Sequence, residues 1–179
     1  MFRLFTSVSL LLAALLSFTA EAEVRRGQKS FGLTAGVNTC NKAPTAGLQF
    51  SYAFSKHFVL APGIDYIFRN EGEDALSINL DYHGPWNLTG DGRWFVYHII
   101  GVNYASWSTH YKQTSVERIR MSVNEDDDVS ERHGRFGLDF GAGVGFNVTQ
   151  SLRLSVQGKF NWLAHHNTGL LNVGISYVF

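Results

Sequence analysis

Cysteine, proline and net charge are all scarce in this chain, and each shortage removes a class of protein. Cys40 is the single cysteine, so neither an intramolecular disulfide nor a thiolate framework for a metal can form. The 15 acidic residues balance the 15 Lys and Arg, which leaves no overall basic field to favour nucleic acid. Only 3 of the 179 residues are proline and 45% are hydrophobic, which excludes a long disordered chain.

Long hydrophobic runs are also missing after the first residues. Residues 1–22 are typical of a secretory signal peptide: Arg3 supplies the positive charge, residues 8–16 the apolar core, and Ala20-Glu21-Ala22 a cleavage site. We therefore expect a mature domain of residues 23–179. Within it no stretch approaches the about 20 apolar residues that a membrane-spanning helix needs. A membrane-bound mature protein would have to cross as strands.

Alternation with a period of two dominates the mature sequence. Phe136–Val148 shows it most clearly, with apolar side chains at even positions and mostly glycine at odd positions. Such alternation predicts a strand with one apolar face and one small or polar face. No segment of the mature chain shows a sustained helical period. The eight expected strands are Ser30–Asn38, Thr45–Phe54, His57–Phe68, Ala75–His83, Trp94–Trp107, Phe136–Val148, Leu152–Leu163 and Gly169–Phe179.

The connections between these strands differ in length. The second, fourth and sixth are turns, and Gly84–Arg93 must contain the fourth even if Trp86 extends the strand before it. The fifth, Ser108–Arg135, is a long polar insertion. Pro62 lies inside the third strand, where its missing amide hydrogen predicts a bulge or other irregularity.

The direction of the two faces decides between a soluble and a membrane barrel. A soluble β-protein turns its apolar face to the core, whereas a membrane barrel turns it to lipid and keeps small and polar side chains inside. Glycines on the polar face and aromatic residues at strand ends, typical of interfacial girdles, favour the membrane barrel. These aromatic residues are Trp86, Trp94, Tyr104, Trp107, Trp162, Tyr177 and Phe179. We therefore predict an all-β fold, an eight-stranded antiparallel up-and-down transmembrane β-barrel.

Five charged residues fall on the predicted inner face. An eight-stranded barrel has room inside for side chains but not for a wide pore. Opposite charges that pair would close such an interior, because a buried charge without a partner is costly. A small conduction path lined by the same residues is the alternative. The predicted interior charges are Asp65, Asp81, Asp139, Arg153 and Lys159.

The mature chain resembles the small outer-membrane β-barrel family that includes the OmpA-like transmembrane domain, OmpX-like and opacity-type proteins. The resemblance rests on the signal peptide, the first strand Phe31–Asn38, the glycine-rich Phe140–Phe146 and the terminal aromatics Tyr177 and Phe179. It covers nearly all of residues 30–179. It implies an outer-membrane location and contact with outer-membrane lipid and lipopolysaccharide. It also implies that the terminal aromatics form the signal read by the barrel assembly machinery.

The resemblance implies a fold but no single activity. We expect a non-enzymatic monomer, without cofactor or nucleic-acid partner, that has a structural, adhesive or ligand-interaction role through its extracellular loops. One alternative is a lipid A-modifying hydrolase, for which His165 and His166 are the nearest candidates. Thr168 stands where a deacylase-type His-x-Ser motif would need Ser, and no acidic residue follows it. A narrow small-solute channel is the other alternative.

The long insertion carries charges of both signs. Glu125–Asp128 could bind a divalent cation through oxygen ligands, but the spacing lacks a calcium-loop signature, which favours a solvated acidic loop. The flanking arginines could pair with these acids or contact phosphates of lipopolysaccharide. They are Arg118, Arg120, Arg132 and Arg135.

Overall fold

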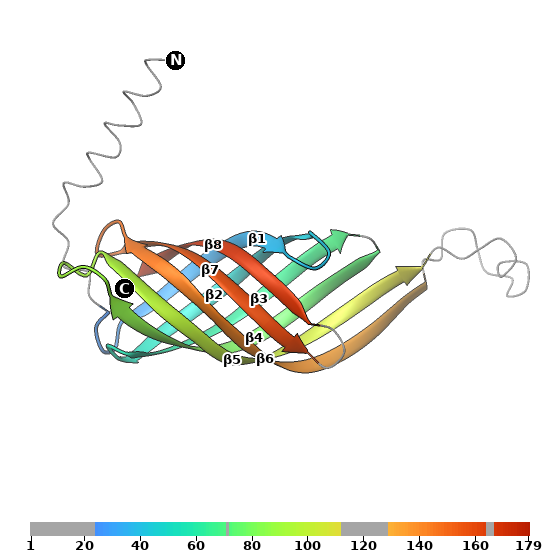
Figure 1. Ribbon diagram of the computed structural model, residues 1–179, viewed down its shortest axis with the longest axis horizontal. Helices are drawn as coiled ribbons and strands as arrows, with labels where there is room; N and C mark the ends of the chain where they lie inside the picture. Colours follow the sequence, from blue (N-terminus) through green and yellow to red (C-terminus); the bar gives the residue numbers. More distant parts are fainter. Residues whose placement is uncertain (1–23, 71, 112–128, 164–166) are drawn as a thin grey trace, which may run out of the picture.

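The computed structural model describes residues 24–70, 72–111, 129–163 and 167–179, without the side chains of residues 110, 111 and 129–131. Strands β1 to β8 form a closed barrel in chain order, and β8 pairs antiparallel with β1 (Figure 1). They are β1 (Lys29–Asn38), β2 (Pro44–Ser55), β3 (Phe58–Asn70), β4 (Glu73–Asn87), β5 (Trp94–Tyr111), β6 (Val129–Asn147), β7 (Leu152–Leu163) and β8 (Thr168–Val178). The predicted fold class is confirmed. None of the described segments is a helix long and apolar enough to span a membrane.

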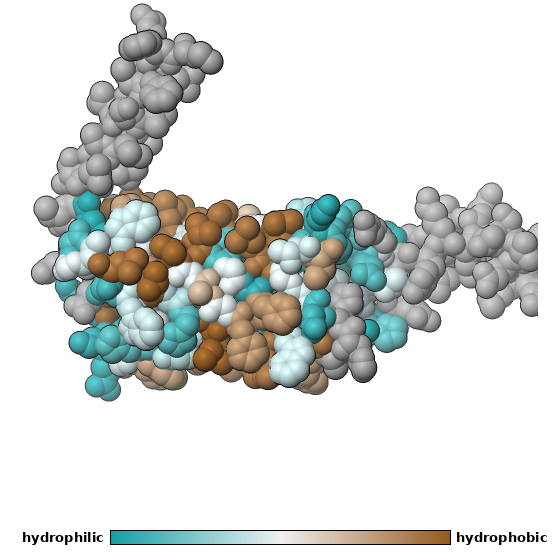
Figure 2. All heavy atoms as spheres, in the orientation of Figure 1, coloured by the Kyte–Doolittle hydropathy of each residue, from teal (hydrophilic) through white to brown (hydrophobic). Residues whose placement is uncertain are grey.

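Side chains of one parity form an apolar outer belt. In β8, Leu171, Val173 and Ile175 are exposed, whereas Leu170 and Asn172, on the other parity, are buried in the lumen. Figure 2 shows apolar side chains over the middle of the barrel and hydrophilic side chains gathered toward both ends. Because the outer face is apolar and the inner face largely polar, the barrel has the inverted polarity expected of a membrane protein.

The two ends of the barrel differ. One end, called the turn end here, carries the β2–β3, β4–β5 and β6–β7 connections. Lys29 and Phe179 also lie there, joined by two main-chain hydrogen bonds of 2.9 Å. The other end, called the hairpin end, is where β5 and β6 project beyond their neighbours (Figure 1).

The predicted insertion Ser108–Arg135 is wrong at both of its ends. β5 continues to Tyr111, β6 begins at Val129, and these two residues are paired. The alternation of apolar and polar residues ends before the strands do, because side chains on the outer face beyond the lipid need not be apolar. The main-chain pairing of β5 with β6 continues past that point. The β4–β5 turn lies within the predicted Gly84–Arg93, and β4 extends through Trp86 to Asn87.

The irregularity predicted at Pro62 is an interruption of strand pairing and not a bulge. The pairs on either side of it, Gln49↔Gly63 and Tyr52↔Leu60, keep one register. Only the pairing with β2 between them is interrupted, as expected for a residue without an amide hydrogen. The register shift between β2 and β3 lies next to their connecting turn instead.

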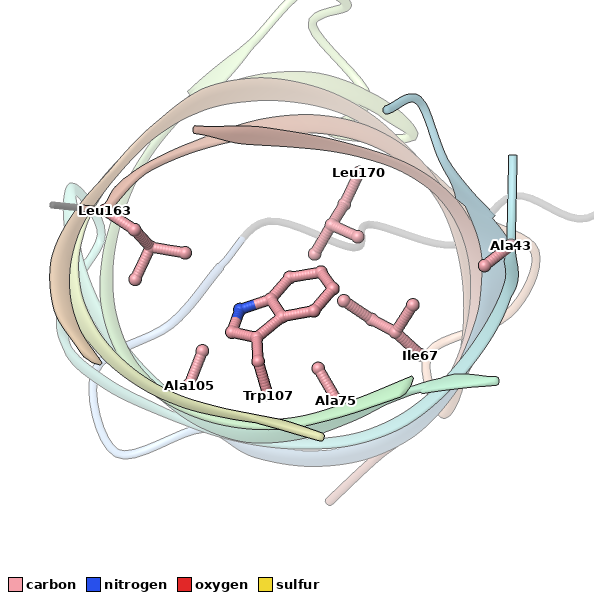
Figure 3. Packing of buried hydrophobic residues seen from close by; sticks show 7 residues of the cluster. All are labelled: Ala43, Ile67, Ala75, Ala105, Trp107, Leu163 and Leu170. Atoms are coloured by element: carbon pink, nitrogen blue, oxygen red, sulfur yellow. The ribbon is translucent and has the colours of Figure 1, made fainter. Parts of the chain in front are cut away.

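The prediction that Trp107 belongs to an outer girdle is also wrong. Its side chain is 6% exposed and points into the lumen (Figure 3). The physical reason is parity: Trp107 shares its face of β5 with buried Ala105, whereas Tyr104 and Trp94 are on the outer face. The other six aromatic residues predicted for the girdle are exposed.

Candidate functional site: the lumen and the projecting hairpin

A lysine and three aspartates meet inside the barrel. Lys159 Nζ, on β7, lies 3.1 Å from Asp81 Oδ2 on β4 and 3.4 Å from Asp139 Oδ2 on β6. Its distance to Asp65 Oδ2 on β3 is 3.6 Å. None of the four side chains is more than 10% exposed. Four of the five predicted interior charges are therefore brought together as one cluster, called the Lys159 cluster here.

Asparagine side chains support the carboxylates of this cluster. Asn79 Nδ2 donates to Asp65 Oδ2 at 2.6 Å, and both Asn103 and Asn161 donate to Oδ1 of Asp139. None of these asparagines was among the predicted site residues. The available signal was their parity, because each lies on the inner face of its strand. Within the described ranges, no group of three or more His, Cys, Asp or Glu is arranged to hold a metal ion.

Arg153 lies apart from the Lys159 cluster, nearer the turn end of β7. Its Nε donates to Asn147 Oδ1 at 2.8 Å, and its guanidinium carbon lies 4.8 Å from the centroid of the Phe95 ring. Together with Tyr97 it lines a lumen cavity of about 40 Å³, which has room for a few water molecules. The structure thus places Arg153 inside but does not bring it to the aspartates.

An apolar layer closes the lumen at the hairpin end. Figure 3 shows the Trp107 indole reaching across the barrel between Ile67, Leu163 and Leu170, with three alanines completing the layer. All these side chains are at most 6% exposed. The signal for this layer was present in the sequence as large apolar residues at inner-face positions.

The segment before β1 fills the opposite mouth. Val24 is buried there against Ala53 and Val59. Gly27 N–H donates to the carbonyl of Ala53 at 2.7 Å, which ties the segment to the end of β2. Side chains therefore occupy the lumen at the turn end, in the middle and at the hairpin end.

The projecting hairpin has one edge that no described strand covers. β4 pairs with β5 as far as Thr109, whereas β7 reaches β6 only at Gly137. In the part of the chain that the structure describes, Val129–Phe136 therefore pair on one side alone, with β5. This stretch of β6 is called the open edge.

Two hydrogen bonds determine which main-chain groups face the open edge. Asn147 N–H donates to Arg93 O on the β5 side, and Val148 N–H donates to Leu152 O on the β7 side, both at 2.9 Å. Because main-chain groups alternate in direction along a strand and the β5–β6 register is constant, even-numbered β6 residues face the β7 side. The open edge presents the N–H and C=O groups of Ser130, Arg132, Gly134 and Phe136.

Exposed side chains flank the open edge. Phe136 is 80% exposed, and its ring centroid lies 4.8 Å from that of Tyr104. Arg132 is exposed as well, and its Nε donates to the Ser108 hydroxyl at 3.3 Å. The edge thus combines main-chain hydrogen-bonding groups with an aromatic ring and a cation.

The predicted assembly residues lie on the outer surface at the turn end. Tyr177 and Phe179 are each 60% exposed, and their rings stack with centroids 6.1 Å apart. Their role as an assembly signal stays a prediction. Other predictions concern residues outside the described ranges: the signal peptide 1–22, Arg118, Arg120, Glu125–Asp128, His165 and His166.

The barrel is similar to several solved outer-membrane proteins. The N-terminal β-barrel domain of Pseudomonas aeruginosa OprF aligns with a TM-score of 0.60 and 13% identity, over 86% of this chain and 98% of that domain. Neisserial surface protein A aligns with a TM-score of 0.60 and 13% identity, over 85% of this chain and 95% of that one. Ail, the attachment invasion locus protein of Yersinia pestis, aligns with a TM-score of 0.57 and 14% identity, over 86% of this chain and 99% of that one.

These structural similarities are not accompanied by a sequence match. No protein-family model matches the chain, and no curated protein sequence does. At such low identities the alignments establish the fold. The chain is an eight-stranded antiparallel β-barrel with the fold of small outer-membrane proteins, and this fold is consistent with a location in the outer membrane.

Proposed function

We propose that this protein is a non-conducting outer-membrane barrel that binds an extended segment of an external partner along the open edge of its hairpin. The observation that carries the proposal is the open edge itself, Val129–Phe136, which pairs with β5 alone. Closure of a barrel removes most strand edges, and among the described strands Val129–Phe136 is the longest stretch that pairs on one side alone. An edge that remains is a template for an added strand, whose main-chain hydrogen bonds supply affinity.

The filled lumen supports an external rather than a conducting role. The Trp107 layer, the Lys159 cluster and the segment around Val24 each occupy the lumen at a different depth. A solute would have to displace a buried ion cluster, which is costly. In planar lipid bilayers we expect no steady conductance, and a steady single-channel current would favour the small-solute channel instead.

The proposal also requires the hairpin end to face outward. Short connections at the turn end are typical of the periplasmic side of such barrels, with longer elements outside. Ail is named for attachment and invasion, which supports an adhesive role for a barrel of this shape without identifying a ligand. None of the three proteins compared above is named as an enzyme, and the absence of enzymatic activity here stays a prediction.

The edge can be tested with a peptide whose backbone is altered. We would measure the anisotropy of a fluorescent Thr-Val-Thr-Val-Thr-Val-Thr-Val peptide with the refolded barrel, and of the same peptide N-methylated at alternate residues. Saturable binding that N-methylation abolishes supports strand addition, because methylation removes the donors needed for the ladder. Equal binding of the two peptides, or no binding, would contradict it.

Arg132 provides matched variants. Arg132→Pro removes an amide that faces the open edge but none of the main-chain hydrogen bonds to β5, whereas Arg132→Gln leaves the main chain intact. Both variants remove the guanidinium and its hydrogen bond to Ser108. We expect Arg132→Pro to abolish peptide binding and Arg132→Gln to retain most of it. Equal loss in both variants would indicate binding through charge and not through the edge. Heat-modifiable migration in gels would verify that both variants are folded.

A further inference from the structure

Two adjoining hollows lie at the rim of the turn end. The first has a volume of about 230 Å³ and is lined by Lys56, His57 and Trp86 among others. The second has a volume of about 400 Å³ and lies between Arg25 and the turn that follows β4, including Leu88. Asn87 lines both hollows, and Val24 and Arg25 are adjacent in the chain, so the two form one continuous surface.

Hydrogen bonds hold the walls of these hollows in place. His57 Nδ1 lies 3.2 Å from the carbonyl of Pro85, and since a carbonyl only accepts, Nδ1 carries the hydrogen. The Tyr82 hydroxyl donates to the carbonyl of His57 at 3.0 Å. On the other side, Ala53 N–H donates to Gln28 O at 2.9 Å and fixes the segment that carries Arg25. These hydrogen bonds therefore fix the main chain of the two segments that carry Lys56 and Arg25.

Positive charge predominates around the hollows. Arg25, Arg26, Lys29 and Lys56 are all exposed at this end. The acidic side chain in the second hollow is Asp91, and its carboxylate already lies 3.8 Å from Arg93 Nε. The hydrogen bond from the Thr89 side chain, followed by that from the Arg93 amide, holds the pKa of Asp91 below its ordinary value.

Apolar side chains border the same hollows on the outer surface. Trp86 is 59% exposed and Leu88 is 61% exposed. The neighbouring rings continue around the barrel, with the Phe54 and Phe58 centroids 5.6 Å apart and those of Phe58 and Tyr82 4.9 Å apart. Aromatic rows of this kind lie at headgroup level in membranes. The hollows therefore combine cations with apolar surface at the depth of lipid phosphates.

We propose that these hollows bind the headgroup of an anionic glycerophospholipid in the leaflet at the turn end. Its phosphate would lie between Arg25 and Lys56, and an acyl chain would run along Trp86 and Leu88. Charge and shape both favour this ligand, because guanidinium and ammonium groups donate to phosphate oxygens and the adjacent outer surface is apolar. The site is independent of the ligand proposed for the open edge.

The test uses the full-length folded barrel in mixed micelles that contain phosphatidylglycerol and phosphatidylcholine. Native mass spectrometry would give the ratio of the two lipids retained. We expect the wild type to favour phosphatidylglycerol, and Arg25→Gln with Lys56→Gln to lower the ratio by roughly fivefold for each cation removed. The matched control is Lys42→Gln with Arg69→Gln, which removes two exposed cations from the hairpin end and should leave the ratio unchanged.

Three outcomes would overturn the proposal. The first is a wild type without preference for phosphatidylglycerol, and the second is an equal fall of the ratio in both double variants, which would indicate general charge attraction. The third is displacement of the bound lipid by millimolar inorganic phosphate, which would assign the hollows to free phosphate and not to a lipid. Heat-modifiable migration of each variant would show that a change in the ratio does not come from misfolding.

Discussion

Replacement of Lys159 by methionine should destabilise the barrel strongly. Lys159 is the cation that approaches Asp81, Asp139 and Asp65, at 3.1, 3.4 and 3.6 Å between Nζ and the carboxylate oxygens. Methionine retains most of the apolar volume of the lysine stem, so the change isolates the charge. It leaves three carboxylates facing one another where water hardly reaches.

The magnitude follows from the burial of the acids. Asp81 and Asp139 side chains are 2% and 0% exposed, so neither can regain its hydration without opening the lumen. Loss of one partner from a buried ion pair costs about 3–5 kcal/mol. We expect a loss in that range. By contrast, Asp65→Asn should cost much less, because Asp65 is the most exposed of the three acids and the most distant from Nζ.

Urea titration of the barrel folded in lipid vesicles, followed by tryptophan fluorescence and by gel migration, would measure these free energies. A second variant tests the cause: adding Asp81→Asn and Asp139→Asn to Lys159→Met should recover a large part of the loss, since the one carboxylate then left without Lys159 is Asp65, the most exposed of the three. The reasoning is refuted if Lys159→Met lies within about 1 kcal/mol of wild type, well below the cost of an uncompensated buried charge. It is refuted as well if the two added substitutions deepen the loss.

Three further predictions concern other parts of the barrel. Trp107→Ala should cost about 3–5 kcal/mol in the same titration because it empties the apolar layer, and bilayer recordings should still show no steady current because the Lys159 cluster remains. Gly101→Val should cost about 1–3 kcal/mol by overpacking, since even a Cβ at Gly101 would lie 2.1 Å from Asp81 Oδ1. Deletion of Phe179 should lower the amount of heat-modifiable barrel in outer-membrane fractions, and unchanged insertion would contradict its role as an assembly signal.

The strands within the lipid belt could be predicted because lipid imposes a rule on every second residue. Phe140, Leu138 and Val144 are exposed on β6, and the glycines between them leave space in the lumen. That rule also placed the four members of the Lys159 cluster on the inner face. Parity could not predict that Lys159 contacts all three aspartates, because the distances between these side chains also depend on the register of the strands.

The rule fails where lipid no longer acts on the chain. Beyond Tyr104 the outer-face positions of β5 hold Ser106 and Ser108 and not apolar residues. The sequence pattern therefore did not indicate that the strand continues to Tyr111. Trp107 was misplaced for a related reason: an aromatic residue near a strand end was taken for a girdle residue, although its odd number put it on the inner face. Parity was the better guide than residue type.

The open edge arises from unequal strand lengths, and this inequality links the fold to the proposed function. A closed barrel leaves no edge when neighbouring strands are of equal reach, but β6 has 19 residues and β7 has 12. β4 follows β5 as far as Thr109, so among the described strands most of the excess is uncovered on the β7 side. Side chains occupy the lumen at three depths, which is why both proposals assign ligands to outer surfaces, the uncovered edge and the basic hollows at the turn end, and these two surfaces can be altered independently.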